Sequence, residues 1–529
     1  MKSVAAALLA AVSMAAAWAQ NAASVDVQRY KVEGNTLLPA AMVEAVLAPF
    51  RGQRTLAEIR NAAAALQAAY REAGWGAVVT FVPEQTLRGG EVAIGVLEGR
   101  IVKVEVTGQQ HTSADSVRRS LPALREGQTP RVRDIDSQIA LANENPARQL
   151  ALTLEPGAKQ GEVDARITVT EQPPVRWTAS VDNTGNSQTG HLRAALAWRH
   201  ANLSDAGDTL TLQVQTSPSK PADVLVLSAS YSRPFAASGL RLDSYVAYSN
   251  VDGGNTATAA GSLQFVGKGR VLGARLTKLL PRWGESEQRV GLSLDRRAYV
   301  NDCSIAGLPP GACGPAGESV TVQPLTLEYT LQHPSDPSAG FNIAWSNNLD
   351  LGGSKARPAN FDAVRSGAPL RYSMWRVGGF INPEIGGDWK LAARLAAQAS
   401  NDALVPGEQF GAAGAGTVRG YSEREVVGDS GYALSLELAS PNLLKAADGD
   451  SPRSLRVVLF GDVGRASNQL DTECRQGHTR CGLSAVGAGL RWAAGPGQLR
   501  LDLARAGQPG TKTEKGDWRL HLAGSWFFE

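Results

Sequence analysis

The sequence lacks the patterns that several classes of function require. Its 529 residues carry a formal net charge of only +3, and no Lys/Arg-rich run is interleaved with aromatic residues. We therefore expect no nucleic-acid partner. Histidine is scarce, and its six residues are scattered without a ligand cluster: His111, His191, His200, His333, His478 and His521. Nothing in these patterns indicates a metal, a cofactor or a catalytic residue, so we expect a protein that is not an enzyme.

Long apolar runs are also missing after the N-terminus. A spanning helix needs about 20 apolar residues, and the only comparable run is shorter, from Val4 to Val12 behind Lys2. Ala17-Trp18-Ala19 has the small-x-small pattern of a cleavage site. A membrane anchor is disfavoured because the run is short and becomes polar at Gln20. We predict a signal peptide over residues 1–19, and export without an α-helical membrane span.

Cysteine is scarce too. The four cysteines fall into two close pairs, Cys303 with Cys313 and Cys474 with Cys481. Each pair lies in a polar or Pro/Gly-rich segment, where an oxidising compartment allows a local disulfide. A single metal site of four cysteines is the alternative, but neither pair has the close spacing typical of zinc ligands. We predict two local disulfides.

The region after the signal peptide contains the same order of elements twice. In the first unit an extended segment at Val25–Val32 precedes an amphipathic helix that stops near Gly74, and further strand patterns follow. A second unit, which begins at Ile101, repeats this order. We predict two small α+β domains, over residues 25–99 and 100–172, that form a periplasmic arm.

The pattern then changes to alternation of period two. In Thr209–Thr216 every second side chain is apolar, and Tyr432–Leu438 alternates in the same way. Such strands suit a soluble sandwich or a barrel with lipid outside and water inside. The barrel is favoured because the alternation continues through residues 175–529 without a helical pattern and aromatic residues stand at the strand ends. We predict an all-β transmembrane barrel of about 16 antiparallel strands.

The strand count predicts where the connections lie. If the first strand begins in the periplasm, the connections after odd-numbered strands lie outside the cell. Both cysteine pairs and the long segment 401–430 then lie outside. Most of the connections assigned to the periplasm are short, as such barrels require. The count places the sixth strand near residue 257, in the stretch Thr256–Leu280, which Gly267 and Gly269 interrupt.

The segment 401–430 is the longest interruption between strand patterns. It contains Val418-Arg419-Gly420-Tyr421, and a P-loop is excluded because Thr417 stands where that motif requires Lys. In the later strand pattern Leu455–Val463, period two places Asp462 on the inner face. An inward Asp needs water or a cation, and Arg419 is able to form a bidentate pair with it. The pattern alone leaves open that Arg419 is a solvated loop residue and Asp462 an ordinary pore-lining charge.

The two α+β units carry recognisable signatures. Val82-Pro83-Glu84-Gln85, Gly90 and Val96–Ile101 resemble the first POTRA domain of two-partner secretion transporters. Asn145-Pro146 and the later Leu154–Gly157 resemble the second. Such domains bind extended clients by adding a strand to a sheet edge or groove. The alternative is that both units are spacers.

The barrel region resembles the same family. Val418-Arg419-Gly420-Tyr421 and the later Phe460-Gly461-Asp462 are similar to the signature of POTRA-barrel assembly factors and two-partner secretion transporters, the latter of the haemolysin secretion/activation type. The resemblance implies that Arg419 and Asp462 form a lock between the loop and the inner wall. It also implies that Tyr421 and Phe460 pack beside this lock and that the loop tip is required for secretion.

The resemblance implies an outer-membrane transporter that secretes a haemolysin- or haemagglutinin-like exoprotein. The implied partners are that protein with its N-terminal secretion domain, outer-membrane lipid and, during biogenesis, the barrel assembly machinery. An assembly factor that inserts other barrels is the alternative, whereas a passive porin needs no periplasmic arm. Many family members begin with a helix that plugs the pore. Because Ala19 to Val25 is too short for a helix of about 20 residues, we expect loop 401–430 to occupy the resting pore.

Overall fold

The structure, a computed structural model, describes residues 24–86, 89–251, 255–258, 261–266, 268–300, 318–444 and 453–529. The predicted signal peptide and the pair Cys303 and Cys313 lie outside these residues. The chain forms two compact units. The first comprises Met1–Gly108, Leu121–Ile139 and Leu150–Val169, and the second comprises Gln109–Ser120, Ala140–Gln149 and Thr170–Glu529.

The first unit begins with a small α+β fold. Its elements are β1 (Ser24–Val27), β2 (Arg29–Glu33), α2 (Ala40–Leu47), η2 (Ala48–Phe50), β3 (Gly52–Thr55), α3 (Leu56–Glu72), β4 (Val78–Phe81) and β5 (Glu91–Glu98). Strands β2, β5 and β4 form one sheet, and β1 pairs with β3 in another. Helix α3 starts at a capping box between Thr55 and Glu58, which satisfies amide groups that the helix itself leaves free. Its buried face includes Leu66 and Tyr70, the centre of a small core.

The single strand predicted over Val25–Val32 is wrong, because this segment forms two strands in different sheets. The chain turns at Gln28, where the amide groups of Gln28 and Arg29 both donate to the carbonyl oxygen of Gly90, at 2.8 and 3.3 Å. Strand β1 then pairs with β3, whereas β2 runs parallel to β5. The apolar residues change from odd to even positions after Val27, which is the sequence signal of the break.

A second α+β fold follows. Its elements are β6 (Arg100–Thr107), α4 (Ala114–Ser120), α5 (Val132–Ala142), β7 (Arg148–Pro156) and β8 (Glu162–Glu171). The sheet has β8 in its centre, with β6 parallel to it on one side and β7 on the other. Within the described residues, no helix is both long and apolar enough to span a membrane. Both folds have the α+β class that the sequence predicts.

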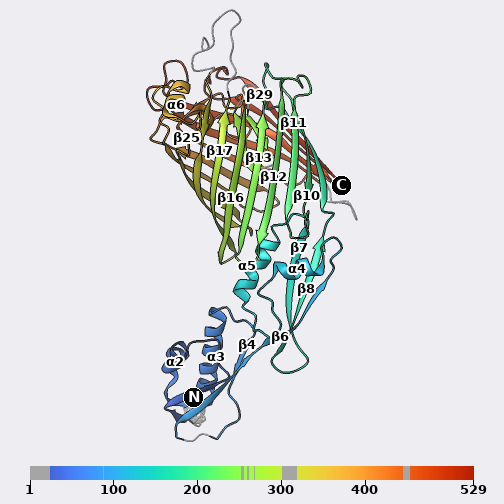
Figure 1. The fold of residues 1–529 in the computed structure, drawn as a ribbon, viewed down its shortest axis with the longest axis vertical. Helices are drawn as coiled ribbons and strands as arrows, with labels where there is room; N and C mark the ends of the chain where they lie inside the picture. Colours follow the sequence, from blue (N-terminus) through green and yellow to red (C-terminus); the bar gives the residue numbers. More distant parts are fainter. Residues whose placement is uncertain are drawn as a thin grey trace, which may run out of the picture. The chain divides into compact units, whose positions relative to one another are not determined.

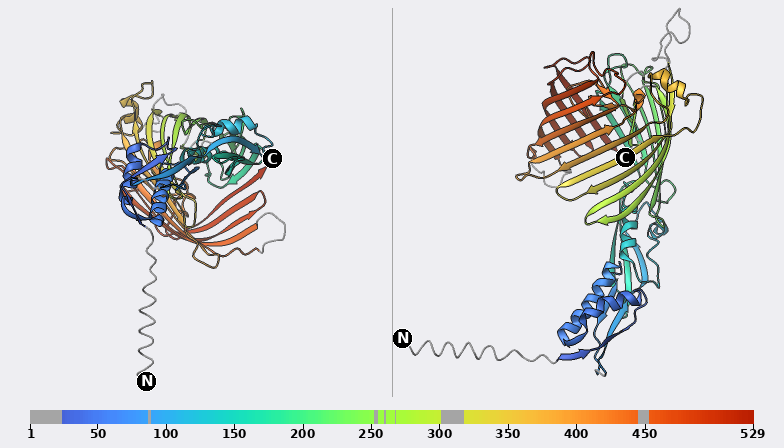
Figure 2. Two further views of the ribbon diagram at one scale, coloured as in Figure 1. Left: turned by 90° about the horizontal axis from the view of Figure 1, so that it is seen from below. Right: turned by 90° about the vertical axis from the view of Figure 1, so that its left-hand side faces the viewer.

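The rest of the chain forms a closed antiparallel barrel (Figures 1 and 2). Its wall consists of β9 (Val175–Asp182), β10 (Arg193–His200), β11 (Thr209–Thr216), β12 (Leu225–Phe235), β13 (Leu240–Ser249), β16 (Gly269–Trp283), β17 (Ser286–Tyr299), β18 (Val320–Val322) with β19 (Pro324–His333), β20 (Ser338–Asn348), β21 (Ser373–Asn382), β22 (Lys390–Ala399), β25 (Ser430–Ala439), β26 (Arg453–Ser467), β27 (Arg480–Ala494), β28 (Gly497–Ala506) and β29 (Trp518–Phe528). Strands β18 and β19 both pair with β17 and act as one wall strand, so the wall has 16 strands. Pairing of β29 with β9, from Ala523 opposite Asp182 to Phe528 opposite Trp177, closes the barrel. The predicted strand number is confirmed.

Side chains alternate between the outer and inner faces along the wall strands, as the sequence pattern predicts. This alternation determines which side chains enter the lumen. In β26 the Leu459 side chain is 57% exposed on the outer face, whereas its neighbours Phe460 and Asp462 are 6% and 1% exposed on the inner face. Large apolar residues recur on the outer face of other strands, as the lipid environment requires. The inner face therefore carries the polar residues that build the site described below.

The predicted start of the sixth wall strand is wrong. Wall strand β16 begins at Gly269, and the preceding segments β14 (Asn255–Thr258) and β15 (Gly261–Val266) pair only with each other. The reason is the length of the neighbouring strand, because β13 ends at Ser249, which lies opposite Gly269. β13 therefore offers no strand residue opposite the described chain before Gly269, and β14 and β15 form a separate hairpin.

The second unit also contains two segments from the second α+β fold, which bond to the barrel end where β10 connects to β11. The Asn145 amide donates to the carbonyl oxygen of Gly207 at 3.2 Å, and the Glu144 carboxylate lies 2.5 Å from Arg241 and 3.0 Å from Arg289. The second α+β fold is predicted to lie in the periplasm, which would make this end of the barrel periplasmic. The connections after even-numbered wall strands lie at this end, as the predicted strand parity requires.

This orientation is testable with epitope tags at the two ends of one strand, β21. Gly352 and Gly386 are exposed, and a Cβ added at either would contact nothing within 4 Å. A tag after Gly352 is expected to bind antibody on intact cells. A tag after Gly386, the matched control, is expected to bind only after the outer membrane is permeabilised. The reverse pattern would invert the topology.

Candidate functional site

The candidate site is built around the connection between β22 and β25, residues 400–429, hereafter the lumen loop. Its two limbs pair with each other through the short strands β23 (Phe410–Gly411) and β24 (Val427–Gly428). Closer to the tip, the amide of Ala412 donates to the carbonyl oxygen of Val426 at 3.0 Å. The lumen loop is therefore a folded hairpin, with the tip residues Val418 to Tyr421 beyond its paired limbs.

The structure brings Arg419 and Asp462 together. The Nε and Nη2 atoms of Arg419 each lie 2.7 Å from one carboxylate oxygen of Asp462, and the Arg419 amide donates to the same carboxylate at 3.1 Å. Both side chains are about 1% exposed or less. Bidentate geometry at this burial makes the pair a strong directional contact, because each charge replaces part of the other's lost hydration. The Phe460 ring lies under the guanidinium, with 3.4 Å between the Arg419 Cζ atom and the ring centroid.

Arg419 also contacts residues that the sequence analysis did not single out. Its Nη1 atom lies 2.6 Å from Glu437 and 3.5 Å from Asp502, and its Nη2 atom donates to the Ser435 hydroxyl at 3.0 Å. The signal for these partners was present, because period two puts Ser435 and Glu437 on the inner face of β25 and Asp502 on the inner face of β28. Only the barrel register shows that three strands present their carboxylates at the same height.

Three wall arginines complete this charged cluster. Arg491 lies 2.7 Å and Arg500 2.6 Å from Asp502, and Arg394 lies 3.4 Å from Glu437. Glu437 and Asp502 are therefore also bonded from the wall side. Such a network is stronger than an isolated pair, because low local polarity strengthens each contact and every member has a partner.

Tyr421, Val418 and Gly420 fix the loop tip by packing and hydrogen bonding. Val418 and Tyr421 are fully buried in one apolar cluster. The Tyr421 hydroxyl lies 2.9 and 2.7 Å from the carbonyl oxygens of Ser484 and Gln508, which share its single proton. Gly420 has a φ of +93°, which favours glycine, and its amide donates to Nε2 of His521 at 3.0 Å. The tip therefore has one defined position against the wall.

The other motif residue and the cysteines have different surroundings. A Cβ added at Gly461 would contact nothing within 4 Å, so the packing gives no reason for glycine there. Cys474, in the connection after β26, forms a disulfide with Cys481 at the start of β27. Both sulfur-bearing side chains are buried in the same cluster as Val418 and Tyr421. This disulfide closes a short loop against the outer end of the lumen loop.

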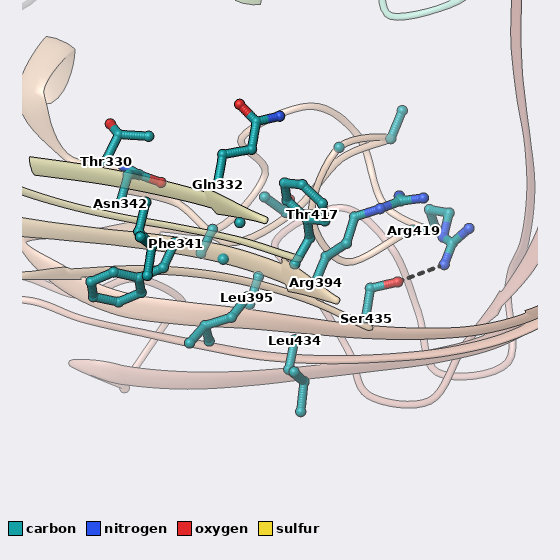
Figure 3. A pocket seen from close by; sticks show the side chains of 18 of the residues that line it. Thr330, Gln332, Phe341, Asn342, Arg394, Leu395, Thr417, Arg419, Leu434 and Ser435 are labelled. Carbon is teal, nitrogen blue, oxygen red and sulfur yellow. Dashed lines mark hydrogen bonds between the residues drawn. The ribbon is translucent and has the colours of Figure 1, made fainter. Parts of the chain in front are cut away.

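A cavity of about 360 Å³ lies beside the charged cluster. It is lined by Arg394, Arg419, Arg500 and Ser435 together with polar side chains such as Asn342. Figure 3 shows the Arg419 guanidinium bonded to Ser435, with Arg394 nearby. In the part of the chain that the structure describes, no group of His, Cys, Asp and Glu side chains is arranged to hold a metal ion. The site therefore offers positive charge and hydrogen-bonding groups rather than metal ligands.

The barrel, the α+β domains and the loop held in the lumen define a class, the outer-membrane transporters with periplasmic POTRA domains. The sequence matches the family described as "Haemolysin secretion/activation protein ShlB/FhaC/HecB" over residues 161–492, and "POTRA domain, ShlB-type" over residues 25–99. The first match covers more than half of the chain, so the protein belongs to this haemolysin secretion/activation family. It is an outer-membrane transporter of the two-partner secretion class, with its POTRA region in the periplasm.

Individual relatives agree with this assignment. The chain is 25% identical over 424 residues to "Outer membrane transporter CdiB" of Escherichia coli O6:K15:H31 (strain 536 / UPEC). The aligned region covers 78% of this chain and 68% of that protein. The solved structure of CdiB from Escherichia coli is similar with a TM-score of 0.79 at 18% identity, covering 97% of this chain and 92% of that one. BamA from Haemophilus ducreyi lacking POTRA domains 1–3 is similar in fold, with a TM-score of 0.50 at 14% identity. The likeness covers 96% of this chain and 100% of that one.

The contacts of Tyr421 predict a loss of stability in Tyr421→Phe. Removing a buried hydroxyl that donates to backbone carbonyl oxygens is expected to cost about 1–3 kcal/mol. The temperature at which the folded barrel unfolds in detergent should fall. Tyr432→Phe is the matched control, because the Tyr432 side chain is 45% exposed on the outer face. Equal unfolding temperatures for both variants would show that the Tyr421 hydroxyl bonds add no stability.

Proposed function

We propose that the lumen loop is the gating element of this transporter and that the pair Arg419 and Asp462 is its lock. The observation that carries the proposal is the bidentate contact between them, at 2.7 Å for both bonds and nearly complete burial. A loop fixed in this way fills part of the lumen, so a translocating chain requires the loop to shift. The lock therefore sets the resting state of the conduit.

The client that suits this conduit is an unfolded haemolysin- or haemagglutinin-like exoprotein with an N-terminal secretion domain. The POTRA domains capture it in the periplasm by strand addition at a sheet edge or groove, where backbone hydrogen bonds supply affinity and side-chain pockets supply selectivity. Support comes from the sheet β2–β5–β4, in which the outer strands β2 and β4 each pair with one strand among the described residues. The client then threads the barrel.

The proposed transport is not enzymatic. Folding of the client outside the cell biases its motion outward, so no nucleotide hydrolysis is needed at the pore. The test is to manipulate periplasmic nucleotide or the proton gradient directly at the pore. If export then stops, folding of the client is not the source of energy. Outer-membrane lipid contacts the apolar outer face, and the barrel assembly machinery inserts the protein during biogenesis.

An assembly factor for other barrels is the second candidate, and the likeness in fold to BamA favours it. The family match favours secretion instead, because it covers residues 161–492 under a secretion description. Depletion of the protein separates the two. Secretion of one exoprotein should stop while the amounts of other outer-membrane barrels stay unchanged, and a general loss of barrels would favour assembly.

Replacing Arg419 with Ala tests the lock. The change leaves Asp462 buried without its guanidinium, which typically costs about 3–5 kcal/mol, and displaces the loop tip. The barrel should still insert, because its wall pairing is unchanged, while the amount of secreted partner falls about tenfold or more. Asp462→Ala should give the same result. Both amounts are measured by immunoblot of outer membranes and culture medium.

Asp388→Ala is the control for this experiment. Asp388 lies 2.7 Å from Arg456, but its side chain is 46% exposed, and exposed pairs contribute little to stability. Export by this variant should match that of the unchanged protein. Undiminished export with Arg419→Ala and with Asp462→Ala would remove the lock from the mechanism.

A further inference from the structure

We propose that the lumen loop has a second anchor, Glu408, which binds a different part of the barrel wall and must be released before the pore opens. This inference rests on the proposed gating by the lumen loop. Glu408 lies in the turn η4 (Pro406–Glu408), on the limb that leads from β22 to the loop tip. Its side chain is fully buried, although carboxylates are almost never fully buried unless they are paired.

The partners of Glu408 lie on β17 and β21. Its Oε1 atom accepts a hydrogen bond from the Tyr299 hydroxyl at 2.6 Å and lies 3.1 Å from Nη1 of Arg297. Its Oε2 atom lies 3.4 Å from Nη2 of Arg376. The partners of Arg419 lie instead on β25, β26 and β28. The lumen loop is therefore bonded to two separate parts of the wall.

The turn η4 fits the wall in shape as well as in charge. The carbonyl oxygen of Glu408 accepts a hydrogen bond from Nε2 of Gln398 at 3.0 Å. Gly407 lies so close to the Tyr299 ring that an added Cβ would overlap it, so only glycine allows this approach. Backbone, side chain and steric fit thus agree on one docked position for the turn.

The two anchors differ in what they leave behind when the loop moves. Arg297 also forms an ion pair with Asp295 of its own strand, so it keeps a carboxylate partner when Glu408 leaves. Among the described residues, Asp462 forms an ion pair only with Arg419, and loss of that partner leaves a buried charge uncompensated. Arg376 loses its ion pair with Glu408, but its side chain is 36% exposed and keeps a hydrogen bond to Gln398 at 2.9 Å. The Glu408 anchor therefore opens and closes without leaving a buried wall charge unpaired.

The test uses the full-length protein in planar lipid bilayers without a client. Glu408→Gln removes the charge and keeps the side-chain size. This variant should raise the ratio of open to closed pore time about tenfold or more. The reason is that hydrogen bonds to a charged carboxylate are stronger than those to a neutral amide. Glu328→Gln is the matched control, because Glu328 pairs with Arg275 at 3.1 Å on the inner wall and is not bonded to the lumen loop. Its open time should not change.

Arg376→Gln is the second variant, in case Glu408→Gln fails to assemble. Arg376 is a partly exposed wall residue that contacts the same carboxylate, so its replacement should raise the open time in the same direction. Heat-dependent mobility in gels reports assembly of every variant. If neither Glu408→Gln nor Arg376→Gln exceeds Glu328→Gln in open time, the second anchor is overturned.

Secretion by Arg419→Ala separates this inference from the function on which it rests. If that variant loses export while the Glu408 and Arg376 variants keep the control's open time, the lock stands and the second anchor fails. If Arg419→Ala exports normally, the proposed gating fails whatever the bilayer result. Raised open time in the Glu408 and Arg376 variants together with lost export in Arg419→Ala supports both.

Discussion

The burial of the Arg419 guanidinium is the constraint on which the site depends. A cation removed from water must recover its lost hydration from fixed partners. Here the Nε, Nη1 and Nη2 atoms all reach carboxylate oxygens, supplied by Asp462 and Glu437. These carboxylates meet only because the barrel register aligns their strands. The loop tip thus depends on the closed wall, and its position in the lumen follows from the fold of the whole barrel.

The rest of the lumen loop is held by contacts of the same kind at its outer end. Asp429 is fully buried and bonded to Arg365 from the connection between β20 and β21. Glu425 accepts hydrogen bonds from the amides of Lys512 and Thr513, at 2.7 and 2.6 Å, in the connection between β28 and β29. A lumen loop held by this many contacts favours two discrete positions over a gradual displacement, because packed interfaces switch between distinct arrangements.

Strand geometry explains which parts of this site the sequence predicts. Period two places Asp462 and Phe460 on the inner face because alternation is a property of any extended strand. It places Glu437 and Asp502 there too, but their meeting depends on register between β25, β26 and β28, which no local pattern encodes. Glu408 lies in a turn without periodicity, so its partners on β17 and β21 follow only from the closed barrel. The break at Gln28 is predictable from the sequence, because the apolar residues change from odd to even positions after Val27.

Charge balance around the lock bears on the proposed passage of a client chain. The cluster combines Arg394, Arg419, Arg491 and Arg500 with Glu437, Asp462 and Asp502. Without Arg419, three arginines and three carboxylates would remain on the wall. Asp462 would still lose its ion-pair partner among the described residues, which favours return of Arg419 to the lock. With these formal charges balanced, the cluster would neither retain nor repel strongly the polypeptide that we propose to pass it.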